Sequence, residues 1–344
     1  MIELDDLIVG CHGKIINQNQ ISFKGVGTDT RKDLTAQIFV ALKGPTFDAH
    51  KFLAEAVKKG AAALLVHDGS SVSTELKNKV TVIEVKDTLL ALQNLATFWR
   101  RKNHAKIFSI TGSNGKTTTK EFSAAIIGAH KKTLFNHGSF NNHFGVPLSL
   151  LEIQTQHEVA IIEMGMNHEG EINELCKIAE PDAVLVTNVG RVHLEGLGTV
   201  ENVAKAKEEI YQSNKKNLVR IFNLDNPYTL KMFDKYIVST PRELVISFSS
   251  HEKKADVRFE VSASNIEGLT ITGEIRGVKG QANVAIFGVH NVNNLMGAAG
   301  LALAAGLTPA QIWSSLHLCH TPWGRNQKVK LKSGAEVVFD GYNA

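Results

Sequence analysis

The chain has 344 residues, of which 43% are hydrophobic and 21% charged, a balance typical of a globular protein with two or three domains. Its formal net charge is only +4 and its basic residues are scattered, which argues against a nucleic-acid-binding protein. No apolar run approaches the ~20 residues of a membrane-spanning helix, and the acidic N-terminus lacks the basic start of a signal peptide. Three widely spaced cysteines, Cys11, Cys176 and Cys319, favour the reducing cytoplasm over a disulfide framework.

Residues 1–103 are predicted to form a small α/β domain. A short helix is expected at 48–60, followed by apolar strands at 62–66 and 80–85. Residues 88–101 are predicted to be an amphipathic helix, because one face collects Leu89, Leu92, Leu95, Ala96 and Trp99. The polar run at 100–104 then indicates a domain boundary.

From residue 104 onward, predicted strands and helices alternate, which favours a doubly wound parallel sheet. The short apolar runs suit strands that are buried on both faces of such a sheet. Residues 255–287 are richer in strand alternation, and 291–306 predict an alanine-rich helix. The remaining expected strands are 107–111, 159–163, 184–187, 219–224, 328–331 and 337–339, and the expected helices are 117–130 and 201–212.

The sequence Thr-Gly-Ser-Asn-Gly-Lys-Thr-Thr at 111–118 lies between a predicted strand and a predicted helix, the context of a phosphate-binding loop. Its glycines allow backbone N–H groups to surround phosphate, and the helix N-terminus adds partial positive charge. Lys116 would contact the β- and γ-phosphates of ATP, and the Thr117 hydroxyl would reach Mg²⁺. Ile110 stands where the strict motif has its first glycine, and the alternative is a plain glycine turn. The expected ATP-binding residues here are Gly112, Asn114, Gly115, Lys116, Thr117 and Thr118.

Two further polar residues lie at or beyond the carboxyl ends of predicted strands of the same sheet. Ligands of open α/β sheets bind beyond the carboxyl ends of the strands, so Glu163 is expected beside the phosphate loop. A carboxylate there suits Mg²⁺, and the alternative is that Glu163 caps the following helix. His193 also follows a strand, although a lone histidine is more often structural. No HExxH or paired CxxC motif indicates a zinc site.

Lys205 and Lys207 lie two residues apart on the helix predicted at 201–212, so they face different sides. One lysine can be solvated while the other points into the site. Composition does not choose between them, and an exposed charged helix remains the simpler interpretation.

Several segments, taken in order, resemble the Mur ligase family of ATP-dependent amide-forming enzymes. Near the N-terminus these are Thr-Asp-Thr-Arg at 28–31, Ile-Phe-Val-Ala-Leu-Lys-Gly at 38–44 and Phe-Asp-Ala-His at 47–50, in which Ala49 replaces the family's glycine. In the centre they are the phosphate loop, Phe-Asn-Asn-His-Phe-Gly-Val-Pro at 140–147 and the stretch 188–210. Toward the C-terminus they are His-Asn-Val-Asn-Asn at 290–294, Gly-Arg at 324–325 and Asp-Gly-Tyr-Asn-Ala at 340–344.

The resemblance implies roles for individual residues. The catalytic set would be Lys116, Glu163, His193 and Lys207, with Lys207 carried as a carbamate. Mg²⁺ would be bound by Thr117, Glu163 and His193. Asn291, Asn294, Arg325 and Asp340 would join the phosphate loop in binding ATP. The UDP-linked substrate would contact Thr30, Arg31, Lys43, Asp48, His50, Asn141 and Asn142.

The resemblance also implies three domains: a UDP-muramyl-binding domain at 1–103, an ATP-binding domain at 104–322, and the beginning of a third at 323–344. The rest of that Rossmann-like C-terminal domain is expected to be missing, so that this chain alone would make almost no product. The implied reaction joins D-alanyl-D-alanine to UDP-N-acetylmuramoyl-tripeptide, and a monomer is expected. The alternatives are another Mur ligase, folylpolyglutamate synthetase, or a nucleotide-binding module that is not an enzyme.

Overall fold

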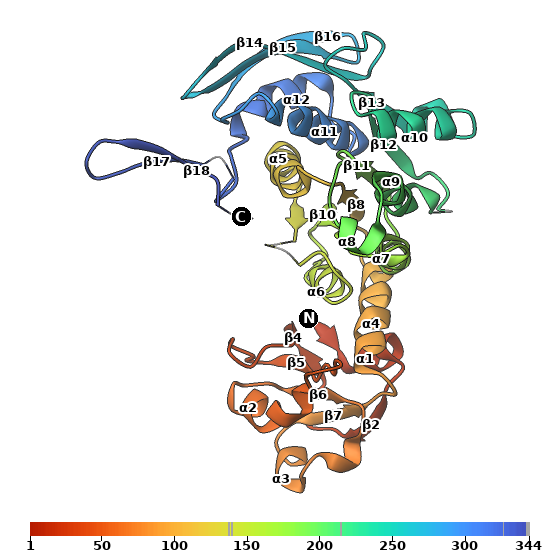
Figure 1. The fold of residues 1–344 in the computed structure, drawn as a ribbon. Coiled ribbons are helices and arrows are strands. Elements are labelled where there is room, and N and C mark those ends of the chain that lie inside the picture. Colours follow the sequence, from red (N-terminus) through yellow and green to blue (C-terminus); the bar gives the residue numbers. More distant parts are fainter. Residues whose placement is uncertain (137, 139, 214, 326, 342–344) are drawn as a thin grey trace. The chain divides into compact units, whose positions relative to one another are not determined.

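The computed structural model describes residues 1–136, 138, 140–213, 215–325 and 327–341, which form two compact units (Figure 1). The first unit comprises Met1–His104 and Asn142–Thr155. The second comprises Ala105–Asn141 and the described residues that follow Thr155. No local sequence pattern indicated that the segment Asn142–Thr155 would join the N-terminal unit.

The first unit is built on a five-stranded sheet in the order β2-β7-β6-β5-β4, in which the edge strand β2 pairs antiparallel with β7 and the other pairs are parallel. The helix expected at 48–60 begins as a 3-10 helix, and Asp48 caps its first turn by accepting a hydrogen bond from His50 N–H. The elements are β1 Ile2–Glu3, α1 Leu4–Cys11, β2 Lys14–Asn17, β3 Ser22–Phe23, β4 Gly25–Gly27, β5 Gln37–Val40, η1 Ala49–Phe52, α2 Leu53–Lys58, β6 Ala63–Val66, η2 Gly69–Ser71, α3 Thr74–Lys77, β7 Thr81–Glu84, α4 Thr88–Lys102 and α6 Gly145–Leu151.

Contacts with α4 attach the inserted segment to the first unit. Trp99 Nε1 donates a hydrogen bond of 2.8 Å to the Ile153 carbonyl, and Gln93 Nε2 donates one of 3.0 Å to the His143 carbonyl. The apolar face predicted for α4 is buried at Leu92, Leu95, Ala96 and Trp99. α4 therefore packs against both α1 and the inserted segment.

The second unit contains a nine-stranded sheet in the order β16-β15-β14-β13-β12-β11-β8-β10-β9. Strands β8 to β13 run parallel, whereas β14 to β16 form an antiparallel meander. The doubly wound parallel sheet predicted from the alternation is confirmed. Its strands are β8 Lys106–Thr111, β9 Thr133–Phe135, β10 Val159–Glu163, β11 Ala183–Val186, β12 Val219–Asn223, β13 Val245–Phe248, β14 Val257–Asn265, β15 Gly268–Ile275 and β16 Val278–Val284.

Helices cover both faces of this sheet, with α5 and α11 on one face and α7 and α9 on the other (Figure 1). Two glycines seat α11 closely on the strands, because a Cβ at Gly300 would lie 2.9 Å from Ile221 Cγ2 and one at Gly297 would lie 3.2 Å from Leu185 Cδ2. The helices are α5 Lys116–Gly128, α7 Glu171–Ala179, α8 Leu194–Leu197, α9 Val200–Glu208, η3 Glu209–Gln212, α10 Pro227–Ile237, η4 Arg242–Leu244, α11 Asn291–Ala304, α12 Pro309–Ser315 and η5 Leu316–Leu318.

A hairpin of β17 Gln327–Lys330 and β18 Glu336–Phe339 ends the described chain, as the sequence predicted. Tyr342, Asn343 and Ala344 of the Asp-Gly-Tyr-Asn-Ala segment lie outside the described residues. None of the helices in the described residues combines the length and apolar character needed to cross a bilayer.

Candidate active site

The phosphate loop joins β8 to α5, and two of its glycines are required by the backbone. Gly115 has a φ of +78°, which L-residues rarely adopt, and a Cβ there would lie 2.2 Å from Asn294 Oδ1. Gly112 has a φ of +151°, and its Cβ would lie 1.9 Å from Thr187 Oγ1. The loop therefore places bare backbone directly against side chains of its neighbours.

The segment that follows β11 supports this loop. Ser113 N–H donates to the Asn188 carbonyl at 2.9 Å, and Asn114 N–H donates to Asn188 Oδ1 at 3.1 Å. The Thr187 hydroxyl donates to the Asn114 carbonyl at 2.6 Å. These contacts fix the loop at the N-terminus of α5, where helix polarity favours an anion.

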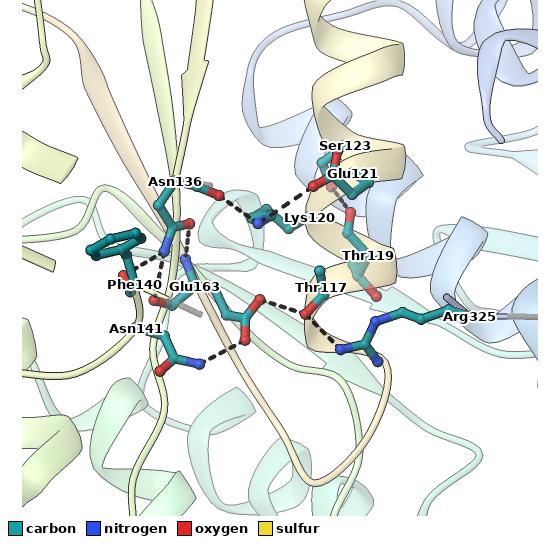
Figure 2. Close-up of polar contacts among 10 residues, drawn as sticks. All are labelled: Thr117, Thr119, Lys120, Glu121, Ser123, Asn136, Phe140, Asn141, Glu163 and Arg325. Atoms are coloured by element: carbon teal, nitrogen blue, oxygen red, sulfur yellow. Dashed lines mark hydrogen bonds and ion pairs between the residues drawn. The ribbon is translucent and has the colours of Figure 1, made fainter. Parts of the chain in front are cut away.

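Lys116 and Thr117 begin α5 at this end of the loop. Lys116 Nζ donates to the Gly112 carbonyl at 2.9 Å, so the ammonium group stays over its own loop. Burial lowers the pKa of Lys116, the charge of Arg325 adds to that shift, and the Glu163 carboxylate opposes it. The Thr117 hydroxyl donates to Glu163 Oε2 at 2.8 Å and accepts from Arg325 Nη2 at 3.2 Å (Figure 2).

Glu163 ends β10, where it is paired with Ile110 at the end of β8. Its carboxylate is buried between the Thr117 hydroxyl and Asn141 Nδ2, which donates to Oε1 at 2.9 Å (Figure 2). The alternative that Glu163 caps the next helix is wrong, because α7 begins later and has Gly170 as its N-cap. The predicted proximity of Glu163 to the phosphate loop is thus observed.

His193 follows β11 and has a φ of +53°, a strained conformation for a residue that is not glycine. Partial desolvation of its ring lowers the pKa of His193, and the nearby charges of Lys207 and Lys116 lower it further. The ring therefore favours its neutral form, which is the form that binds metals. Among the described residues, no three His, Cys, Asp or Glu side chains gather into a group that could hold a metal ion.

Lys207, and not Lys205, is the lysine of α9 that turns inward. Lys207 is 2% exposed, and within the described part of the chain it has no hydrogen bond or ion pair. Burial, followed by the charge of Lys116, lowers the pKa of Lys207 to about 7. Lys205 instead pairs with Glu169 at 2.7 Å on the exposed side of the helix.

Asn291 and Asn294 begin α11 beside the phosphate loop. Asn291 Nδ2 donates to the Phe287 carbonyl at 2.8 Å, and Asn294 Nδ2 donates to Asn291 Oδ1 at 2.9 Å. The Thr119 hydroxyl donates to Asn294 Oδ1 at 3.3 Å, which links this pair to α5. Both amides are buried, so this chain of contacts fixes their orientation.

The residues expected to bind the UDP-linked substrate fall mainly in the first unit. Arg31 forms an exposed ion pair of 2.8 Å with Asp29, and Lys43 Nζ lies 3.9 Å from Asp48. Asp48 Oδ1 lies 2.6 Å from His50 Nδ1, which orients the imidazole ring. Thr30 is half-buried in the turn before Arg31.

Asn141 and Asn142, although adjacent, belong to different units. Asn141 contacts Glu163, whereas Asn142 Oδ1 accepts from Gly145 N–H at 2.9 Å at the start of α6. Asp340 lies in the exposed segment that directly follows β18.

Sequence reasoning missed three polar residues that support these side chains. Lys120 and Asn136 are buried beside Glu163, and His67 Nδ1 lies 2.8 Å from His50 Nε2. A signal existed for Lys120, because it shares the buried stripe of α5 with Ser123 and Ile127 at helical spacing. Asn136 directly follows β9, at the same edge of the sheet where Glu163 ends β10.

The doubly wound sheet and its glycine-lysine-threonine loop define the second unit as a P-loop nucleotide-binding domain. The model of the Mur ligase middle domain matches residues 110–302, and that of the Mur ligase family, catalytic domain, matches residues 22–100. The chain belongs to the Mur ligase family.

Individual relatives extend this assignment over most of the chain. The UDP-N-acetylmuramoyl-tripeptide–D-alanyl-D-alanine ligase of Haemophilus influenzae is 36% identical, with 96% of this chain and 70% of that protein covered. MurF from Acinetobacter baumannii superposes with a TM-score of 0.89 at 29% identity, over 99% of this chain and 72% of that one. MurF from Thermotoga maritima in complex with ADP superposes with a TM-score of 0.77 at 26% identity, over 93% and 71%.

Proposed function

We propose that this chain belongs to an enzyme that uses ATP to join D-alanyl-D-alanine to UDP-N-acetylmuramoyl-tripeptide, in the synthesis of the bacterial cell wall. The observation that carries the proposal is the start of α5, where Lys116 and the Thr117–Glu163 pair meet beside the phosphate loop. The ADP complex of the Thermotoga relative supports an adenine nucleotide as the ligand of this loop. The names of the relatives support the two other substrates.

The proposed reaction has two steps. The terminal carboxylate of the tripeptide attacks the γ-phosphorus of ATP, the bond to the bridging oxygen breaks, and ADP leaves. The amine of D-alanyl-D-alanine then attacks the carbonyl carbon of the acyl phosphate, phosphate leaves, and the nitrogen loses a proton. Negative charge develops on the transferring phosphoryl group, and Lys116, whose ammonium group lies over the phosphate loop, is proposed to stabilise it.

Mg²⁺ fits the donor set at this site. The Thr117 hydroxyl and the Glu163 carboxylate are hard oxygen donors 2.8 Å apart, and His193 is proposed as a further ligand. These residues would hold the ion, which neutralises charge on the phosphates of the nucleotide. Arg325, which also contacts Thr117, adds a positive charge that belongs to the protein and is present with or without Mg²⁺.

Lys207 is proposed to be carried as a carbamate. Its pKa of about 7 leaves a substantial share of the amine neutral at neutral pH, and only the neutral amine attacks CO₂. The nitrogen forms a bond to the carbon of CO₂ and loses a proton, which gives an anionic carbamate. The carbamate is negatively charged, so Lys116 attracts it, whereas Lys116 repels the ammonium form of Lys207. The carbamate also provides oxygens near the nucleotide.

The first unit is proposed to bind the UDP-linked substrate through Thr30, Arg31, Lys43, Asp48 and His50, with Asn141 and Asn142 contacting its muramyl part. Its cationic groups suit a diphosphate, and Asp48 fixes the ring of His50. Asn291, Asn294 and Asp340 are proposed to contact ATP with Arg325. We place the reaction in the cytoplasm, because all three cysteines are free and buried.

Calorimetric titration with UDP-N-acetylmuramoyl-tripeptide tests the proposal. We expect saturable binding, and weaker binding of the corresponding dipeptide that lacks the third residue. Tighter binding of the dipeptide would favour the ligase that adds the third residue, and binding of a folate instead would favour folylpolyglutamate synthetase. A chain that binds ATP but none of these compounds would be a nucleotide-binding module, contrary to the proposal.

A further inference from the structure

Lys120 is a charged residue with a completely buried side chain, one turn beyond Lys116 on α5. Its Nζ donates to the backbone carbonyl of Asn136 and lies 3.5 Å from Glu121 Oε1 (Figure 2). The same nitrogen is 5.9 Å from the ring centroid of Phe135. Burying an ammonium group is costly, and an apolar residue would serve packing alone at lower cost. Packing in the core therefore does not explain why a lysine occupies position 120.

Asn136, which Lys120 holds by its carbonyl, extends the pairing of β9 with β10. β9 ends at Phe135, opposite Ile161, and Asn136 N–H donates to the Ile161 carbonyl at 3.3 Å. Its side chain then takes the place of the next peptide group, because Oδ1 accepts from Glu163 N–H at 2.9 Å and Nδ2 lies 3.4 Å from the Glu163 carbonyl (Figure 2). The same Nδ2 donates to the Phe140 carbonyl at 2.8 Å.

Both backbone polar groups of Glu163 are therefore held by one side chain, which is anchored in turn by a buried cation. We propose that Lys120 and Asn136 are positioning residues, which fix Glu163 so that its carboxylate stays beside the Thr117 hydroxyl for Mg²⁺ binding. This inference rests on the metal role proposed above for Glu163. Lys120 has no exposed surface and so does not reach the nucleotide itself.

A positioning role and a purely structural role differ in one measurable quantity. A positioning residue affects the gain in nucleotide affinity that Mg²⁺ produces, whereas a structural residue affects affinity with and without the metal alike. Residues that orient metal ligands typically change metal affinity by about 10- to 100-fold when they are replaced.

The experiment measures calorimetric binding of the non-hydrolysable ATP analogue AMPPNP to the whole chain, with Mg²⁺ and with EDTA. Lys120→Met and Asn136→Ala are expected to reduce the Mg²⁺-dependent gain by about 10- to 100-fold, while metal-free affinity is unchanged. Should Lys120→Met not fold, Asn136→Ser provides the test, because it leaves the lysine in place.

Ser123→Ala is the matched control. Ser123 is also buried on α5, where its hydroxyl donates to the Thr119 carbonyl at 2.7 Å, but it does not contact Asn136 (Figure 2). This variant loses a buried hydrogen bond from the same helix and is expected to keep the full Mg²⁺-dependent gain.

Glu163→Gln separates failure of this inference from failure of the proposed metal site. If Glu163→Gln loses the Mg²⁺-dependent gain in AMPPNP affinity while Lys120→Met and Asn136→Ala keep it, only the positioning role is overturned. A gain retained in Glu163→Gln would overturn the metal role and the inference with it. Equal weakening with and without Mg²⁺ in the Lys120 and Asn136 variants would assign them to the core, which also contradicts the inference.

Discussion

Lys116 lowers the pKa of Lys207, although the two lysines lie on different helices, α5 and α9. Burial is the larger cause, and together the two effects bring the pKa of Lys207 from 10.5 to about 7. Between these two values the unfolded chain binds more protons at Lys207 than the folded chain does. The contribution of Lys207 to the free energy of unfolding therefore rises as the pH increases from about 7 to 10.5. Below pH 7 the folded state bears the full cost of burying a charged amine.

Lys207→Met is accordingly expected to raise the melting temperature most at or below pH 7, and the gain should shrink toward pH 10. Thermal melts of both proteins in CO₂-free buffers measure this difference. Lys205→Met is the control on the same helix, since an ion pair with Glu169 raises the pKa of Lys205 and so moves its titration above the window. A Lys207→Met difference that is constant with pH would contradict the lowered pKa.

The neutral amine of Lys207 also predicts a reaction with bicarbonate buffers. In ¹³C-bicarbonate we expect a carbamate carbon signal in the NMR spectrum, which should strengthen as pH rises above about 7 because the share of neutral amine increases. The signal should be absent from Lys207→Arg and present in Lys205→Arg. Its persistence in Lys207→Arg would assign the carbamate to another amine.

Gly115→Ala tests the close fit of the phosphate loop. The left-handed backbone costs an alanine about 1–2 kcal/mol, and the new Cβ would displace Asn294, so both stability and AMPPNP affinity should fall. Gly128→Ala, at the exposed end of the same helix with nothing within 4 Å of its Cβ, should instead stabilise by about 0.5–1 kcal/mol. Thermal melts are expected to show a loss of stability for Gly115→Ala and a gain for Gly128→Ala, and calorimetry to show the fall in AMPPNP affinity. Stability changes of the same sign would contradict the close fit of the phosphate loop around Gly115.

Asp48→Ala tests the first unit, with Asp68→Ala as its control. Both aspartates cap 3-10 helices, so each variant should lose a little thermal stability, but only Asp48 orients His50. Asp48→Ala should therefore weaken binding of UDP-N-acetylmuramoyl-tripeptide by about tenfold, the effect of a lost hydrogen bond to a charged group. AMPPNP affinity should not change. Equal substrate affinity in the two variants would exclude Asp48 from the binding site.

The sequence predicted the parts of the site that have local signals. The phosphate loop has its glycines and lysine between a strand and a helix, and Glu163 is a polar residue at the end of an apolar run. Parallel pairing of β10 with β8 then brings both to one edge of the sheet. No distant contact had to be known for either prediction.

Other features depend on contacts that are distant in sequence. Helical spacing showed that Lys205 and Lys207 face different sides, but only packing shows that Lys207 is the buried one. Asn136 acquires its role from β10, which comes more than twenty residues later in the chain. Asn142–Thr155 joins the first unit through α4, although it follows the phosphate loop in sequence.

The glycines of α11 give distant positions influence over the nucleotide site. Gly297 and Gly300 let α11 pack so closely against Leu185 and Ile221 that no room is left for a larger side chain at either glycine. Asn294 lies on the same helix. A methyl group added at Gly300 would push α11 away from Ile221, and the Asn294 amide would move with the helix although the methyl group does not contact it. If Asn294 contacts ATP as proposed, a substitution at Gly300, far from the phosphate loop, is expected to change nucleotide affinity.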